Sequence, residues 1–133
     1  MSKILHIIAG LFLLSVFTGC ATTLSPTGVY QGDTVLYNAD IVFNTATTTV
    51  DQFLKYELAN RGTPAAPKGL TQAADKIRGE WPRIHDAYYS ARDLYTANKS
   101  AANLSSFQKA ITDAQGALSI ASGFLTSAQP KAP

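Results

Sequence analysis

The sequence contains a single cysteine, Cys20, and this scarcity excludes a disulfide within the chain. Histidine is almost as rare: there are two among the 133 residues, and only His85 lies beyond residue 19. Without a second cysteine or a pair of histidines at helical spacing, the chain lacks the usual ligands of a zinc site. Glycines do not gather into a phosphate-binding loop ahead of a helix. We therefore expect no metal site and no cofactor.

Charged residues are also scarce, at 15% of the chain, and the formal net charge is only +2. No run of basic residues provides the electrostatic surface that nucleic-acid binding requires. Residues that could catalyse a reaction are equally scarce, because His85 is the only obvious general base. Asp86 follows it directly, and neighbouring side chains on a helix point about 100° apart, so Asp86 is poorly placed to orient it. We therefore expect no nucleic-acid partner and no enzymatic activity.

A short apolar segment stands at the start of the chain. Lys3 provides a positive charge, and residues 4–17 are largely apolar. This stretch is shorter than the ~20 apolar residues of a transmembrane helix and is typical of a secretory leader. It ends in the sequence FTGC at residues 17–20. This tetrapeptide resembles the lipobox of bacterial lipoproteins, in which small residues precede an obligatory cysteine. An ordinary secretory leader with an incidental cysteine is the alternative.

The resemblance implies that residues 1–19 are a signal peptide that is removed, and that the thiol of Cys20 takes a diacylglycerol. It also implies two or three acyl chains on the mature protein. Each buried methylene contributes about 0.8 kcal/mol, so several chains hold a protein on a membrane where one chain binds only marginally. Ala21, directly after the cysteine, resembles the residue found at this position in Gram-negative lipoproteins that are sent to the outer membrane. The expected location is the cell envelope, on the periplasmic face of the outer membrane.

The rest of the chain divides into a lipidated tether, residues 20–32, and one domain, residues 33–133. The domain contains three stretches in which apolar residues alternate spacings of four and three, which keeps one side of a helix apolar. The three sets are Val35, Ala39, Val42, Ala46, Thr49, Phe53 and Tyr56; Leu70, Ala74, Ile77, Trp81, Ile84, Tyr88, Ala91 and Tyr95; and Leu104, Phe107, Ile111, Ala114, Leu118, Ala121, Leu125 and Ala128. Short connections make neighbouring helices antiparallel, so the expected fold is an all-α, antiparallel three-helix bundle.

Local signals place the ends of these helices. Asp33 or Thr34 is expected to cap the first helix, and Gly62 to follow its end in the left-handed conformation. The turns are expected at residues 63–69 and 98–103, and a capping box at Ser105 and Gln108.

Two features oppose regular helices. Residues 40–50 are rich in β-branched side chains, which favour strands weakly, although packing usually overrides that preference. Pro82 removes a backbone hydrogen bond in the second helix. Because the apolar spacing continues through Pro82, we expect one kinked helix there.

The second helix is rich in aromatic residues. Trp81, Tyr88 and Tyr95 recur every seven residues, which is the spacing of a bundle seam, so we expect them in the core. Other residues of this helix lie off the seam and combine aromatic with cationic groups, as binding hot spots often do. The candidate partner surface is His85, Tyr89 and Arg92. The third helix is rich in small residues, and its surface offers self-association as an alternative.

These observations favour a non-enzymatic envelope lipoprotein whose helical bundle is a structural or protein-interaction module. One alternative is a small-ligand or cell-wall binding module that uses the aromatic second helix. Another is a lysis or exclusion lipoprotein encoded by a phage or plasmid, since small lipoproteins of those systems are similar in size and leader. The sequence leaves the identity of the partner open.

Overall fold

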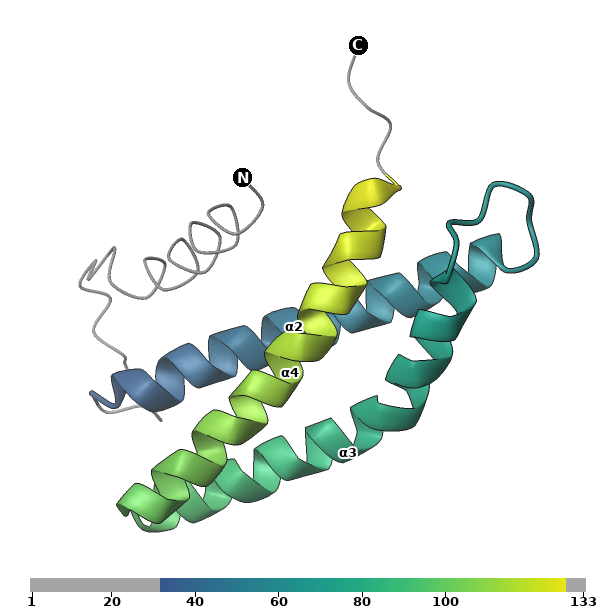
Figure 1. Ribbon diagram of the computed structural model, residues 1–133. Helices are drawn as coiled ribbons and strands as arrows, with labels where there is room; N and C mark the ends of the chain where they lie inside the picture. Colours follow the sequence, from purple (N-terminus) through teal and green to yellow (C-terminus); the bar gives the residue numbers. More distant parts are fainter. Residues whose placement is uncertain (1–31, 129–133) are drawn as a thin grey trace, which may run out of the picture. The chain divides into compact units, whose positions relative to one another are not determined.

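The computed structural model describes residues 32–128, which form three helices joined by two short loops (Figure 1). Helix α2 spans Thr34–Asn60, α3 spans Leu70–Ala97, and α4 spans Ala101–Ser127. Consecutive helices run antiparallel, and no strand occurs in the described range. The all-α three-helix bundle predicted from the heptad spacing is confirmed. The predicted leader, Cys20 and most of the tether lie outside the described residues.

The ends of α2 follow the local signals in the sequence. Asp33 is the N-cap, and its Oδ1 accepts a hydrogen bond from the backbone N–H of Leu36 at 3.0 Å. Gly62 has a φ of +74°, the left-handed conformation expected just after the helix. Residues 40–50 lie within this one continuous helix, so tertiary packing overrides their β-branched preference.

The turn between α3 and α4 is shorter than expected. Ser100 is the N-cap of α4 and accepts a hydrogen bond from the backbone N–H of Asn103 at 3.2 Å. The Asn103 side chain donates to the carbonyl of Asn98 at 2.8 Å, which closes the turn. The predicted capping box at Ser105 and Gln108 is therefore wrong, because the helix has already begun one turn earlier.

Pro82 lies inside α3, as predicted, and the helix continues on both sides of it. A proline in a helix lacks a backbone donor, and its ring crowds the carbonyl four residues earlier. Figure 1 shows α3 bending along its length while α2 stays nearly straight. The bend redirects the first half of α3 and so shapes the space between α3 and α4.

The seam of α2 differs from the prediction by one residue at four of the seven predicted positions. Ala39, Ala46 and Phe53 are buried as expected. In place of the predicted Val35, Val42, Thr49 and Tyr56, the buried residues are Leu36, Phe43, Val50 and Glu57, and Asp40 is also buried. Both sets recur every seven residues. The buried face contains two charged residues, Asp40 and Glu57, so a purely apolar pattern does not reveal it.

The seam of α3 agrees with the prediction better than that of α4, in which only Phe107, Ala114 and Ala121 of the expected residues are buried. In α3 every expected seam residue is buried except Trp81 and Ile84, which are half-buried. The buried residues of α4 are Phe107, Ala110, Ala114, Ala117 and Ala121. The alanines bring the backbone of α4 close to its neighbours, so the larger Ile111 and Leu118 lie at the flanks of the interface.

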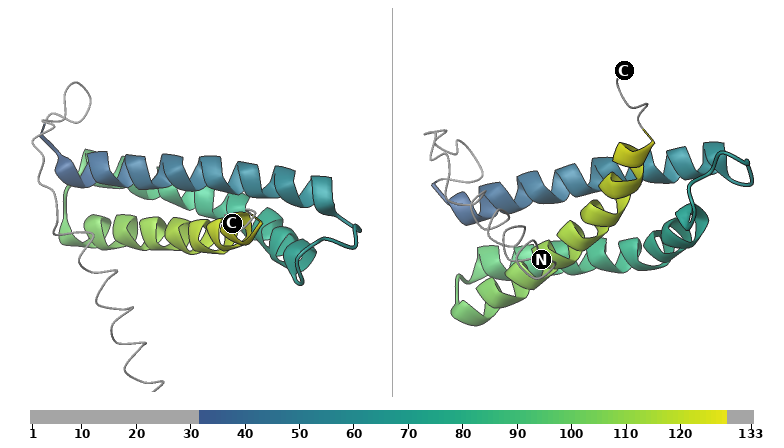
Figure 2. Two further views of the ribbon diagram at one scale, coloured as in Figure 1. Left: turned by 90° about the horizontal axis from the view of Figure 1, so that it is seen from above. Right: turned by 45° about the horizontal axis from the view of Figure 1, so that its top comes forward.

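Helix α4 packs extensively against both α2 and α3, whereas α2 and α3 contact each other much less; the two views in Figure 2 show α4 alongside the other two helices. The core beneath has two halves. Near the α2–α3 loop it is largely aliphatic, around Val50, Leu70 and Ile77. Near the α3–α4 turn it is aromatic: the rings of Phe43 and Tyr88 stack with centroids 3.8 Å apart, and Phe107 contacts Tyr88 at 5.5 Å.

Candidate functional site

The candidate partner surface lies where α2 and α3 meet, and a buried ion pair supports it. Arg92 Nε and Nη2 donate to Asp40 Oδ1 and Oδ2 at 2.9 and 2.8 Å, a bidentate pairing that fixes both groups. The hydroxyl of Tyr88 also donates to Asp40. Burial, together with this hydrogen bond, raises the pKa of Tyr88 above its ordinary value of 10.0, so the hydroxyl keeps its proton. Asp40 is therefore a hub that ties α2 to α3.

This network changes the role expected for Arg92. Its guanidinium is partly buried and occupied by Asp40, so it is mainly a structural cation. The sequence does not indicate the role of Asp40, because its partners Tyr88 and Arg92 are 48 and 52 positions away. The only local signal is an acidic residue next to the apolar position Ala39.

Tyr89 and His85 do lie at the surface, one turn apart on α3. Their rings are 4.8 Å apart, and the Tyr89 ring also makes an edge contact with Phe43 at 5.5 Å. Tyr89 is 44% exposed, so part of its side chain faces solvent while its ring packs against His85 and Phe43. His85 Nδ1 lies 3.5 Å from Asp86 Oδ1. The structure thus brings His85 and Tyr89 together and sets Phe43 beneath them.

A shallow hollow of about 260 Å³ adjoins these aromatic rings. The residues that line it are Asp40, Phe43, Asn44, Tyr88, Tyr89 and Arg92. Its walls come from both α2 and α3. We call this region, together with His85, the α2–α3 surface.

A second charged cluster lies at the other end of α2. The side chain of Glu57 is completely buried, and Arg61 Nε donates to its Oε1 at 2.7 Å. Arg78 of α3 donates to its other oxygen, and both arginines also contact Asp75. The hydrogen bonds from Arg61 and Arg78 lower the pKa of Glu57 from 4.5 to about 2. This cluster joins α2 to α3 beside the loop and is a structural feature.

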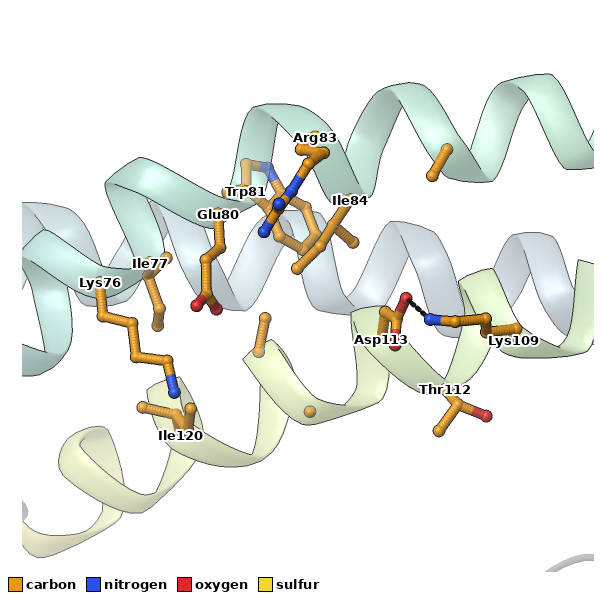
Figure 3. Close-up of a pocket in the computed structure, with 13 residues that line it drawn as sticks. Lys76, Ile77, Glu80, Trp81, Arg83, Ile84, Lys109, Thr112, Asp113 and Ile120 are labelled. Atoms are coloured by element: carbon orange, nitrogen blue, oxygen red, sulfur yellow. Dashed lines mark hydrogen bonds and ion pairs between the residues drawn. The ribbon is translucent and has the colours of Figure 1, made fainter.

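A larger groove, of about 660 Å³, runs between α3 and α4 on another side of the bundle (Figure 3). Its apolar lining comes from Ile77, Trp81, Ile84, Ala87, Ala117 and Ile120. Its polar lining comes from Lys76, Glu80, Arg83, Lys109, Thr112 and Asp113. Gly116 completes the α4 side, and a Cβ added there would meet no atom within 4 Å. We call this site the α3–α4 groove; the sequence did not indicate it, because it depends on how two distant helices pack.

Some charged side chains of the α3–α4 groove form an ion pair, and others do not. Lys109 Nζ and Asp113 Oδ2 form an ion pair 2.7 Å apart on α4. Figure 3 shows Lys76 and Glu80 reaching from α3 toward α4. Within residues 32–128, the side chains of Lys76, Glu80 and Arg83 form no hydrogen bond or ion pair. These three side chains keep their hydrogen-bonding capacity for water or a ligand.

No protein-family model matches the chain, and no curated protein or solved structure is significantly similar to it. None of the three described helices is both long and apolar enough to cross a membrane. In the same part of the chain, no three His, Cys, Asp or Glu side chains gather in a way that would hold a metal ion. The function proposed below therefore depends on the motif in the leader and on the two surfaces just described.

Proposed function

We propose that the chain is a non-enzymatic, lipid-anchored protein of the bacterial cell envelope, and that its helical bundle binds a protein partner. The anchor is supported by Lys3, the apolar stretch 4–17 and the small residues before Cys20. Two or three acyl chains on Cys20 supply stable attachment. Ala21 favours the periplasmic face of the outer membrane as the location.

The tether then sets how far the bundle stands from the membrane. Residues 21–32 reach at most about 40 Å when fully extended, at ~3.3–3.6 Å per residue. The helical unit begins at Asp33, directly after this tether. A module held at that distance meets partners within the same membrane or close to it.

The observation that supports a binding role is the packing of Tyr89. A ring that is 44% exposed yet held by contacts with His85 and Phe43 loses little conformational entropy when a partner covers it. Aromatic residues in such positions are common binding hot spots. The α2–α3 surface is therefore the proposed docking site for the partner.

Lipid attachment is tested with Cys20→Ser and with Thr23→Ser, a conservative change in the tether, as the matched control. We expect the control to incorporate a palmitate analogue and to sediment with membranes. Cys20→Ser should do neither, and it should accumulate as precursor or appear in the soluble fraction. Unchanged membrane attachment and unchanged mass in Cys20→Ser would refute the anchor.

The docking site is tested with Tyr89→Ala in a pull-down from solubilised membranes. Leu94→Ala is the matched control, because Leu94 is another large, exposed apolar residue of α3. Both variants should stay folded by circular dichroism, but only Tyr89→Ala should lose the partner recovered by the unmodified chain. Equal recovery by both variants would contradict the assignment of the docking site.

A second candidate function is the binding of a small ligand or of cell-wall material by the second helix. The α3–α4 groove favours it, because its volume falls within the ~300–1,000 Å³ of typical ligand sites and Trp81 lies in it. The chemistry of that groove allows the ligand class to be specified.

A further inference from the structure

Trp81 gives the α3–α4 groove a flat apolar wall. Its indole stacks on Phe43 with centroids 5.8 Å apart and an interplanar angle of 13°, which fixes the plane of the ring. Trp81 is only half-buried and lines the groove with Ile77 and Ile84. A fixed aromatic face beside aliphatic side chains suits a flat or ring-shaped group, such as the apolar C–H face of a sugar.

Charged side chains at the rim of the groove disfavour an apolar ligand. A hydrophobic helix laid into this groove would offer no polar partner to Lys76, Glu80 or Arg83, and removing charged groups from water without a new partner is unfavourable. Lys76 and Arg83 are instead suited to a carboxylate, which arginine binds in a bidentate manner. Glu80 can accept hydrogen bonds from hydroxyl or amide groups.

We propose that the α3–α4 groove binds an acidic saccharide of the cell wall, with a sugar ring on Trp81 and a carboxylate between Lys76 and Arg83. This chemistry is that of a muramyl glycopeptide, which combines sugar rings, amides and free carboxylates. The proposal rests on the second candidate function and is independent of the α2–α3 surface.

The test uses tryptophan fluorescence, because Trp81 is the only tryptophan of the whole chain. The purified full-length chain in detergent is titrated with N-acetylmuramyl-alanyl-isoglutamine and, in parallel, with the neutral sugar diacetylchitobiose. We expect a saturable change in Trp81 emission with the muramyl compound at concentrations below about 1 mM. Chitobiose should bind at least about tenfold more weakly, because it lacks the carboxylate that Lys76 and Arg83 would bind.

Two variants assign the signal to the groove. Arg83→Gln removes the cation and should weaken binding about tenfold or more. Gly116→Leu fills the groove from α4, where an added Cβ meets no atom within 4 Å, so it should abolish binding while leaving the helical spectrum unchanged. Lys68→Gln is the matched control, because Lys68 is an exposed cation of the α2–α3 loop, outside the groove; it should bind as the unmodified chain does.

Three results would overturn the proposal. The first is an unmodified chain whose Trp81 emission does not respond to the muramyl compound at several millimolar. The second is equal affinity for chitobiose, and the third is unchanged binding by folded Arg83→Gln and Gly116→Leu. A failure here is distinct from a failure of the docking site, because the pull-down with Tyr89→Ala reports on the α2–α3 surface alone.

Discussion

Glu57 should make the bundle sensitive to acid, and Glu57→Gln should remove that sensitivity. The side chain is completely buried, and hydrogen bonds from Arg61 and Arg78 lower its pKa to about 2. In the unfolded chain the carboxyl returns to an ordinary pKa of about 4.5. The stabilisation is therefore complete above pH 4.5 and disappears as the pH falls through 2.

The size of this stabilisation follows from the difference between the folded and unfolded pKa values of Glu57. A pKa that falls from 4.5 to about 2 corresponds to at most about 3 kcal/mol. The Arg61 and Arg78 side chains are 46% and 32% exposed, so water screens part of this interaction, and we expect about 2 kcal/mol. That is a large fraction of the ~5–10 kcal/mol that stabilises a domain of this size. The corresponding fall in Tm is about 10 °C.

The assay is urea denaturation followed by far-ultraviolet circular dichroism at several pH values between 7 and 2. Glu57→Gln should be about 2 kcal/mol less stable than the unmodified chain at pH 7, and the two curves should converge near pH 2. Asp51→Asn is the matched control, because it removes the same charge from an exposed ion pair with Lys55. It should cost less than about 0.5 kcal/mol. Parallel pH profiles for Glu57→Gln and the unmodified chain would refute the reasoning.

The remaining predictions concern the Asp40 network and a helical glycine. Arg92→Ala should cost about 2–3 kcal/mol, because it leaves the carboxylate of Asp40 largely buried with its main cation removed, whereas Tyr88→Phe should cost only about 1 kcal/mol for one lost hydrogen bond. Thermal melts compare the two, and an Arg92→Ala variant as stable as the unmodified chain would show that this pair is not structural. Gly123→Ala should raise the free energy of unfolding by about 0.5–1 kcal/mol, because alanine is the better helix former and the added Cβ meets no atom within 4 Å; a lower Tm would contradict this.

The sequence predicts the fold well because the signals for it are local. The three helices, the cap at Asp33 and the left-handed Gly62 each follow from residues a few positions apart, and the structure confirms them. The error at Ser105 arises because several Ser and Asn residues near the turn are all competent caps. Asn103 favours Ser100 as the cap, because its backbone N–H donates to Ser100 Oγ and its side chain donates to the carbonyls of Leu94 and Asn98 at the end of α3.

The parts that the sequence does not predict depend on long-range pairing. Glu57 and Asp40 are acidic residues at buried positions of α2, and their arginine partners Arg78 and Arg92 lie 21 and 52 positions away. A pattern of apolar spacing does not indicate that either acid is buried. Without the pairing to Asp40, the same pattern predicts Arg92 as an exposed surface cation. The half-buried state of Trp81 has a similar origin, since it reflects the space that Gly116 and its neighbours on α4 leave open.

The dominance of α4 in the packing has a consequence for the order in which the molecule acquires its structure. A ribosome releases α2 and α3 first, and their backbones approach each other much less than either approaches α4, although aromatic stacking and ion pairs join the two helices. Neither can bury its whole apolar face until α4, which packs against both, has been synthesised. We therefore expect the complete core to form only after α4 has been synthesised. If the chain is exported, as the proposed envelope location requires, this delay would help to keep the polypeptide unfolded until α4 has passed through the membrane.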